Sequence, residues 1–152
     1  MNENSEQMRR QIKRRMMQTI FLLMFSAGAL FAQNANDIIG KYRLPNGLDV
    51  EIYKNGDVYD GKIIALHDYE GGETKDVNNP DKSKRDEPLV GKEIIHGLKF
   101  DKDDKQWVDG SMYGPEKGIN LNLKVTEMHD DEIVVVGSKY LFWKTLRWKK
   151  IN

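Results

Sequence analysis

Apolar and polar residues alternate with a period of two along most of the chain after residue 32. The clearest example is the segment 119–126, where Ile119, Leu121, Leu123 and Val125 alternate with polar residues. Such alternation places successive side chains on opposite faces of a β-strand. No window of this region shows apolar residues at helical spacing. The pattern therefore predicts an all-β domain.

Eight segments with a strand-like pattern are separated by turn-forming residues. The expected strands are 38–44, 48–54, 58–67, 93–101, 105–113, 118–128, 132–139 and 142–150. Asn46-Gly47 and Asn55-Gly56 are typical of two-residue hairpin turns, whose central residues need positive φ. Gly137-Ser138-Lys139 is a further candidate for a tight turn. Neighbouring hairpins predict an eight-stranded antiparallel up-and-down barrel, because closure removes exposed edges. A sandwich is the alternative, but it needs crossovers between sheets, and only the connection 68–92 is long enough for one.

The first thirty-two residues have the pattern of an export signal. Basic residues between positions 9 and 15 precede an apolar core of about thirteen residues, 19–31. A membrane-spanning helix needs roughly 20 apolar residues, and polar Gln33 follows too soon. We expect cleavage near Ala32, which leaves a single domain, 33–152, with no transmembrane anchor. The expected location is therefore the periplasm or the exterior of a bacterial cell.

Charge and cysteine content narrow the function classes. Residues 33–152 carry 19 Lys and Arg against 22 Asp and Glu, a net charge of −3. This mild acidity argues against nucleic acid as a partner, because nucleic-acid-binding domains usually present a basic face. The absence of cysteine excludes a thiol nucleophile and a lipid anchor on cysteine. An apolar core must stabilise this domain without disulfides.

No catalytic or metal-binding template fits the chain. His67, His96 and His129 are far apart and show no ligand spacing. The polar segment 76–91 places acids at some positions of a calcium loop, but Pro80 and Asp81 stand where a ligand and a glycine are needed. We therefore predict no metal, no cofactor and no catalytic residue. A hydrolase built on His67, Asp76 or Asp109 is the enzymatic alternative.

Two regions mix residue types in the way that ligand sites do. In the first, 76–91, Arg85 either ties the loop to nearby carbonyl or carboxylate groups or meets an acidic ligand. In the second, 105–113, strict alternation would place Trp107, Asp109, Ser111 and Tyr113 on one face. Large rings beside a few polar groups suit a binding site, and they equally suit a barrel rim.

The last predicted strand carries two of the three tryptophans. The separation between Trp143 and Trp148 is odd, so these two side chains fall on opposite faces and one of them points inward. An inward tryptophan either fills the core or lines a ligand cavity.

Five short motifs occur in a specific order. They are DIIGKY at 37–42, DGKI at 60–63, DVNNPD…R…LVG at 76–91, W-x-x-G-x-x-Y-x-P-x-x-G at 107–118, and TLRW at 145–148. This order resembles the exported bacterial domain-of-unknown-function family numbered 2147, over residues 37–150. The resemblance implies a lipocalin-like (calycin-type) barrel of the bacterial envelope with no established activity.

The resemblance also suggests where single residues lie. In that fold a Gly-x-Trp element in the first strand packs across the barrel floor, and Gly40-Lys41-Tyr42 holds the matching place here, with Tyr for Trp. Gly114 stands where the family usually has aspartate, and 120–123 lacks the family's tyrosine, so any site that needs those groups is in doubt. The matching positions carried over as a candidate site are Asn79, Pro80, Arg85, Trp107, Gly110, Tyr113 and Pro115.

These observations predict an exported lipocalin-like protein that is not an enzyme. It is expected to hold a small, partly apolar ligand or lipid in the barrel or at its mouth. The candidate ligand-binding residues are Asn79, Arg85, Trp107, Asp109, Tyr113 and Trp148. The alternative is an interaction module that presents the connection 68–92 to another protein of the envelope.

Overall fold

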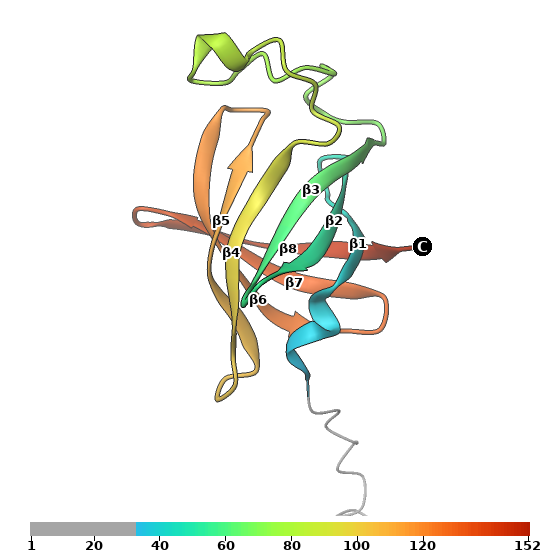
Figure 1. The fold of residues 1–152 in the computed structure, drawn as a ribbon, viewed down its shortest axis with the longest axis vertical. Coiled ribbons are helices and arrows are strands. Elements are labelled where there is room, and N and C mark those ends of the chain that lie inside the picture. Colours follow the sequence, from blue (N-terminus) through green and yellow to red (C-terminus); the bar gives the residue numbers. More distant parts are fainter. Residues whose placement is uncertain (1–32) are drawn as a thin grey trace, which may run out of the picture. The chain divides into compact units, whose positions relative to one another are not determined.

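Eight antiparallel strands close into a barrel in residues 33–152, the part of the chain that the computed structural model describes (Figure 1). The strands follow one another around the barrel in sequence order, and β8 pairs back onto β1. They are β1 (Gly40–Arg43), β2 (Leu48–Asn55), β3 (Val58–Leu66), β4 (Glu93–Asp101), β5 (Gln106–Gly114), β6 (Ile119–Met128), β7 (Glu132–Lys139) and β8 (Phe142–Ile151). The predicted eight-stranded up-and-down barrel is confirmed, and the sandwich is excluded. The predicted export signal and its cleavage site lie outside the described residues.

The ends of some elements differ from the prediction. The first strand begins at Gly40 rather than at residue 38, because Ile38 belongs to a short 3₁₀ helix, η1 (Ala35–Ile38). Asn55 pairs with Val58, so the two-residue turn is Gly56-Asp57, one position later than predicted. The turn predicted at Gly137-Ser138-Lys139 is wrong. Those residues pair with β8, and the chain reverses at Tyr140 and Leu141.

Aromatic side chains from three strands close one end of the barrel around η1. The Tyr42 hydroxyl donates to the Ile38 carbonyl at 2.8 Å, and the Tyr59 hydroxyl donates to Oδ1 of Asn36 at 2.8 Å. Trp107 Nε1 donates to the Ala35 carbonyl at 2.9 Å. Burial raises the pKa of Tyr42, and the negative charge of Asp37 raises it further. Tyr42 therefore packs at the floor of the barrel, at the place that the family resemblance indicated.

A β-bulge in β5 reverses the face on which its side chains lie. Trp107 pairs with Val125, and Gly110 pairs with Leu123, so β5 holds one residue more than β6 between these pairs. Asp109 takes up the difference with a φ of 61°. Trp107, Gly110 and Met112 are consequently buried, while Asp109 is exposed. The predicted common face of Trp107, Asp109, Ser111 and Tyr113 is therefore wrong, because strict alternation ends at the bulge.

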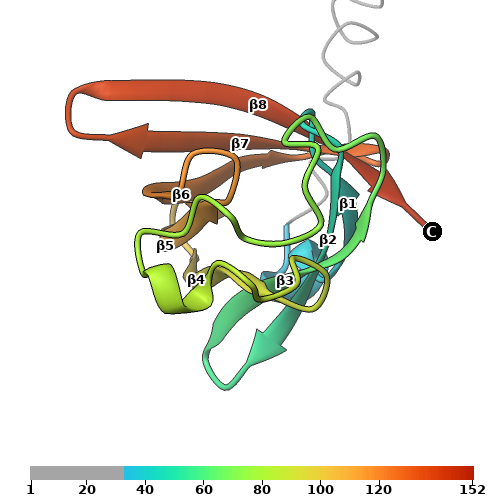
Figure 2. The same cartoon turned by 90° about the horizontal axis from the view of Figure 1, so that it is seen from above.

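The connection between β3 and β4, residues 67–92, crosses the opposite end of the barrel (Figure 2). It contains the short helix η2 (Lys82–Lys84) and an isolated bridge between Lys75 and Pro88. Backbone hydrogen bonds join Leu89 to Thr74 at 2.9 Å and Gly91 to Ile63 at 2.8 Å. We call this connection the strap. These bonds give it a fixed conformation of its own.

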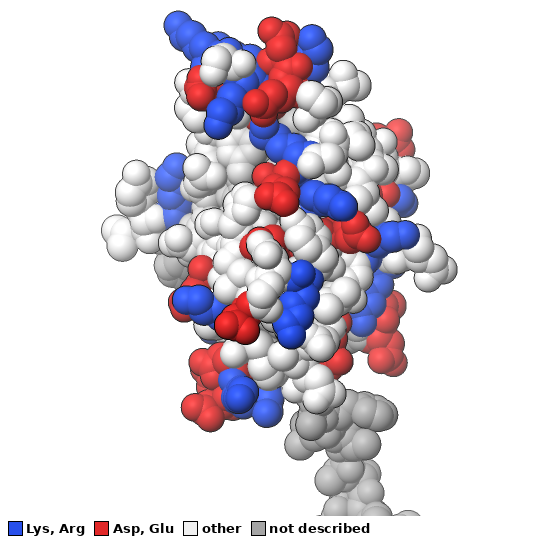
Figure 3. All heavy atoms as spheres, in the orientation of Figure 1, with Lys and Arg blue, Asp and Glu red and all other residues white. Residues whose placement is uncertain are grey.

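One face of the protein is mixed in charge. On the face in Figure 3, basic and acidic side chains are interspersed rather than gathered into one patch. That face lacks the continuous basic stripe that a nucleic acid backbone needs. Within residues 33–152, none of the helices has the length and apolar character to cross a membrane.

Candidate functional site

A cavity of about 320 Å³ lies at the strap end of the barrel. Most of its apolar wall comes from four neighbouring strands, β5 to β8. These residues are Met112, Leu121, Leu123, Val135, Leu146 and Trp148, and Leu44 and Pro45 of the β1–β2 connection complete the wall. This volume is at the lower end of the range for pockets that hold small molecules. The barrel is therefore filled by side chains at the η1 end and hollow toward the strap.

Trp148 is the polar element in the apolar wall. Its side chain is 1% exposed, and its Nε1 has no hydrogen-bond partner among the described residues. Buried indole N–H groups usually find a partner, because leaving such a donor unpaired costs about 1–3 kcal/mol. One residue of the apolar wall thus carries a buried donor that no described residue satisfies.

The rim of the cavity carries charges of both signs. Glu70 comes from the strap, Glu116 and Lys117 from the β5–β6 turn, and Lys144 from β8. A mixed rim of this kind fits a ligand with a polar end at the mouth and an apolar body inside.

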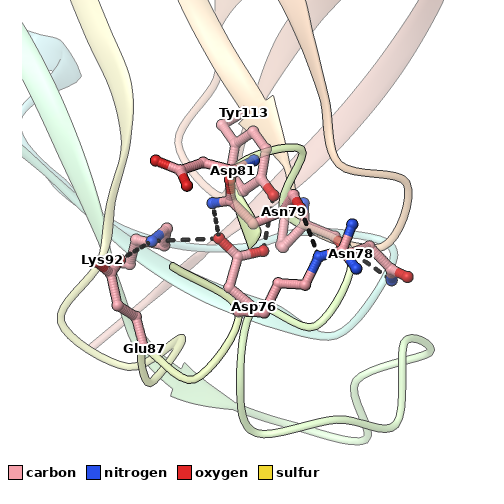
Figure 4. A network of polar contacts seen from close by, with 9 residues as sticks. Asp76, Asn78, Asn79, Asp81, Glu87, Lys92 and Tyr113 are labelled. Carbon is pink, nitrogen blue, oxygen red and sulfur yellow. Dashed lines mark hydrogen bonds and ion pairs between the residues drawn. The ribbon is translucent and has the colours of Figure 1, made fainter. Parts of the chain in front are cut away.

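A buried carboxylate, Asp76, holds the strap in place (Figure 4). Its Oδ1 accepts a hydrogen bond from the Tyr113 hydroxyl at 2.7 Å. Its Oδ2 accepts one from Asn79 Nδ2 at 2.6 Å and lies 3.2 Å from Lys92 Nζ. Lys92 Nζ also lies 2.6 Å from Oε2 of Glu87. The carboxylate therefore joins the middle of the strap to its C-terminal residue, Lys92, and to β5.

A second contact fixes the strap to the β5–β6 turn. Asn78 Nδ2 donates to the carbonyls of Pro115 and Glu116 at 3.3 and 3.2 Å. The backbone of Asn78 also lies against Gly118, where an added Cβ would come 2.0 Å from the Asn78 oxygen. Gly118 has a φ of 63° as well, so both space and conformation require glycine there.

The charges in this network shift two pKa values. Partial burial alone lowers the pKa of Lys92, but its hydrogen bonds to Glu87 and Asp76 outweigh that effect and raise it. Burial raises the pKa of Tyr113, and the hydrogen bond to the Asp76 carboxylate raises it further. Both groups therefore keep their protons more firmly in the folded protein than in the unfolded chain.

Comparison with known proteins places these motifs in a family. A family model described as an uncharacterized protein conserved in bacteria (DUF2147) matches residues 40–150. The chain belongs to the DUF2147 family. This match confirms the resemblance that the order of the five motifs indicated. The comparison with curated proteins gives no match.

A solved structure shares the fold of this DUF2147 protein. It is protein HP1028 from the human pathogen Helicobacter pylori, described as belonging to the lipocalin family. The TM-score is 0.66 with 18% sequence identity, over 76% of this chain and 84% of that chain. At this identity the likeness shows the fold alone, which is lipocalin-like.

The structure places the six predicted ligand-binding residues in four different regions. Asn79, Arg85 and Tyr113 lie in or beside the Asp76 network, where Arg85 Nε donates to the Asn79 carbonyl at 2.8 Å. Trp107 is fully buried at the η1 end, and Asp109 lies on the outer surface, 3.7 Å from Lys99 Nζ. Of the six, only Trp148 lines the cavity.

Sequence reasoning did not select the other cavity residues. Met112, Leu121, Leu123 and Leu146 are ordinary core residues by pattern, since a filled core and a lined cavity show the same alternation. Lys92 was also missed, because its pairing with Asp76 joins positions sixteen residues apart in an irregular segment. Among residues 33–152, no three His, Asp or Glu side chains lie close enough together to hold a metal ion.

Loss of the Tyr113 hydroxyl should destabilise the DUF2147 barrel in a pH-dependent way. We expect Tyr113→Phe to lower the free energy of unfolding by about 1–2 kcal/mol near neutral pH, because a buried carboxylate oxygen loses its donor. Since folding raises the Tyr113 pKa, this stabilisation is complete below the ordinary value of 10.0 and is lost as the pH rises through the higher folded value. Urea unfolding of both proteins across this range tests the expectation. Tyr140→Phe, at a residue that is 90% exposed, is the control and should change neither quantity.

Proposed function

We propose that this DUF2147 protein is an exported, non-enzymatic binding protein that holds a small, partly apolar ligand in the cavity at the strap end. The observation that carries the proposal is the largely apolar cavity of about 320 Å³, whose lining includes Trp148 with its unpaired Nε1. The ligand has an apolar body against Leu121, Leu123 and Leu146, and a carbonyl, ether or hydroxyl oxygen that accepts from Trp148. Its polar end lies near the rim.

The pattern of residues 1–32 supports export. The contacts of the strap also bear on the alternative, in which residues 68–92 capture another protein of the envelope. The polar side chains of the strap bond mainly to one another and to β5 and the β5–β6 turn. No specific observation on the described residues favours capture of a partner.

Native mass spectrometry of protein purified gently from its own envelope tests the proposal. We expect a protein–ligand complex with a mass above that of the apo protein. After the ligand is removed, adding fatty acids or other lipids should restore a complex of this kind. Gly137→Phe should abolish it, because an added Cβ at Gly137 faces open space and meets only Leu121 Cδ1, at 3.8 Å. Val136→Phe, one residue away on the opposite face of β7, is the matched control and should bind normally.

Trp148→Phe tests the role of the indole N–H. Phenylalanine keeps a six-membered aromatic ring but removes the pyrrole part of the indole with its N–H, so we expect the affinity to fall about five- to tenfold. A single apo mass with no shift on adding lipids would contradict ligand binding. Binding that is unchanged in Trp148→Phe would leave the cavity as the site but remove the hydrogen bond from it.

A further inference from the structure

The tip of the β7–β8 hairpin exposes four apolar residues in a row. Tyr140, Leu141, Phe142 and Trp143 are 90%, 86%, 81% and 74% exposed. Single exposed apolar residues are common on proteins, but contiguous ones usually mark a contact surface. We call residues 139–144 the hairpin tip.

The turn itself is built against local preference. Lys139 pairs with Phe142, so Tyr140 and Leu141 are the two turn residues. Tyr140 has a φ of 54°, a conformation that two-residue hairpins normally assign to Asn or Gly and that is unusual for a bulky residue. Neither side chain gains burial in return. Strain that contributes nothing to the fold indicates a functional reason for these residues.

Two positive side chains, Lys139 and Lys144, flank the apolar residues of the hairpin tip. Residues 137–150 carry five positive side chains and no acidic one, in a domain whose net charge is −3. They are Lys139 and Lys144 at the tip, Arg147, which pairs with Glu132 of β7, and Lys149 and Lys150 at the far end of β8. This charge fits an anionic partner. A second copy of the chain fits less well, because pairing along β8 would bring the same positive charges together.

The hairpin projects away from the barrel (Figure 2). The pairing of β6 with β7 ends at Ser138, and β1 pairs with β8 only from Lys149 to Ile151. The tip is therefore free of both neighbouring strands. Because Lys144 and Leu146 line the cavity, the tip also lies beside the cavity mouth.

We propose that the hairpin tip docks on the surface of an anionic lipid bilayer. Tyr140, Phe142 and Trp143 lie at the level of the headgroups and upper acyl chains, where aromatic side chains are favoured, and Leu141 enters the acyl region. Lys139 and Lys144 contact the anionic headgroups. Aliphatic Leu141 at the apex suits hydrocarbon better than the stacked bases of a nucleic acid. The proposal does not depend on the cavity having a ligand.

Vesicle binding by residues 33–152 tests this proposal. This part of the chain contains the whole closed barrel and its core, and it excludes any contribution from residues 1–32. The vesicles contain phosphatidylglycerol and phosphatidylcholine in equal parts, or phosphatidylcholine alone. We expect binding to the first, weakened by salt, and little binding to the second. Trp143 fluorescence should shift to the blue. Trp107 and Trp148 are already buried, so Trp143→Phe should bind and lose the shift.

Two variants remove the tip and its charges separately. The tip variant combines Tyr140→Asn, Leu141→Gly, Phe142→Thr and Trp143→Thr. It installs a favoured Asn-Gly hairpin turn, so the barrel should still fold. We expect its binding to anionic vesicles to decrease at least about tenfold. Lys139→Gln with Lys144→Gln should lower binding by about tenfold or more. The matched controls are Ile39→Thr, 45% exposed beside η1, and Lys54→Gln with Lys102→Gln at exposed positions. Both should bind like the wild type.

Three results would overturn the proposal. The first is no binding to anionic vesicles, and the second is equal binding by the wild type and the tip variant. The third is a dimer in analytical ultracentrifugation that the tip variant loses while neither protein binds vesicles. That result would assign the tip to contact with a second copy.

Discussion

Replacing Trp107 with alanine is expected to lower the free energy of unfolding by about 3–5 kcal/mol. The Trp107 side chain is fully buried, and its ring lies 5.0 Å from that of Phe100. Its Nε1 also holds the Ala35 carbonyl of η1 at 2.9 Å. Alanine would leave a large cavity at the closed end and free one carbonyl of η1. Urea denaturation followed by circular dichroism measures the change.

The chain supplies a matched control for this experiment. Trp143 is the same residue type but is 74% exposed, so Trp143→Ala should change the stability by less than about 0.5 kcal/mol. Trp107→Phe keeps a six-membered ring and removes the hydrogen bond. Its loss of stability should therefore lie between those of Trp107→Ala and Trp143→Ala. Equal stability of Trp107→Ala and Trp143→Ala would show that η1 and the floor aromatics do not stabilise the barrel.

The alternation of side chains predicts the barrel well because burial on one face leaves a strong trace in sequence. The segment 119–126 alternates without interruption and lies wholly within β6. Tyr42 was correctly placed at the barrel floor through the family resemblance, and the odd separation of Trp143 from Trp148 correctly predicted that one points inward. Trp148 is buried and Trp143 is exposed.

Local geometry set by distant contacts was not predictable. The bulge in β5 depends on how Gly110 fits against Leu98, where an added Cβ would come within 2.6 Å. The sequence shows a glycine there but not its neighbour. Likewise the predicted strands 132–139 and 142–150 correctly leave Tyr140-Leu141 between them, but neither of these two is a usual turn residue, so a tight turn was assigned to Gly137-Ser138-Lys139. Residue preferences predict only those turns that are built from the preferred residues, and the Tyr140-Leu141 turn is not one of them.

The cavity and the hairpin tip are connected through β8. The η1 end is filled by Trp107, Tyr42 and Ile38, all fully buried. The strap end is hollow, and Lys144 and Leu146 of β8 connect its wall to the hairpin tip. A protein that contacts a bilayer through this tip holds its cavity mouth close to the membrane surface. Membrane contact and lipid uptake are therefore compatible in one orientation.

Removal of the Asp76 carboxylate is expected to lower the free energy of unfolding by about 2–4 kcal/mol. Asp76→Ala removes the acceptor for Tyr113 and Asn79, and it takes one of two carboxylates from Lys92, whose side chain is only 15% exposed. The remaining pairing of Lys92 with Glu87 at 2.6 Å keeps the loss below that of an isolated buried charge. Urea unfolding measures the total loss, and hydrogen exchange of the strap shows where it occurs.

Two further substitutions decide what the Asp76 carboxylate contributes. Asp76→Asn keeps an oxygen for the Tyr113 hydroxyl but turns an amide toward the Asn79 donor, so it should recover part of the loss. Asp86→Ala removes an acid of the same strap whose side chain is 94% exposed and pairs with Lys75, and it should have little effect. If Asp76→Ala were as stable as Asp86→Ala, the strap would be held by its backbone bonds alone. A carboxylate buried without contributing to stability would then be explained best by a role in binding, and the strap would return as the candidate site for a partner.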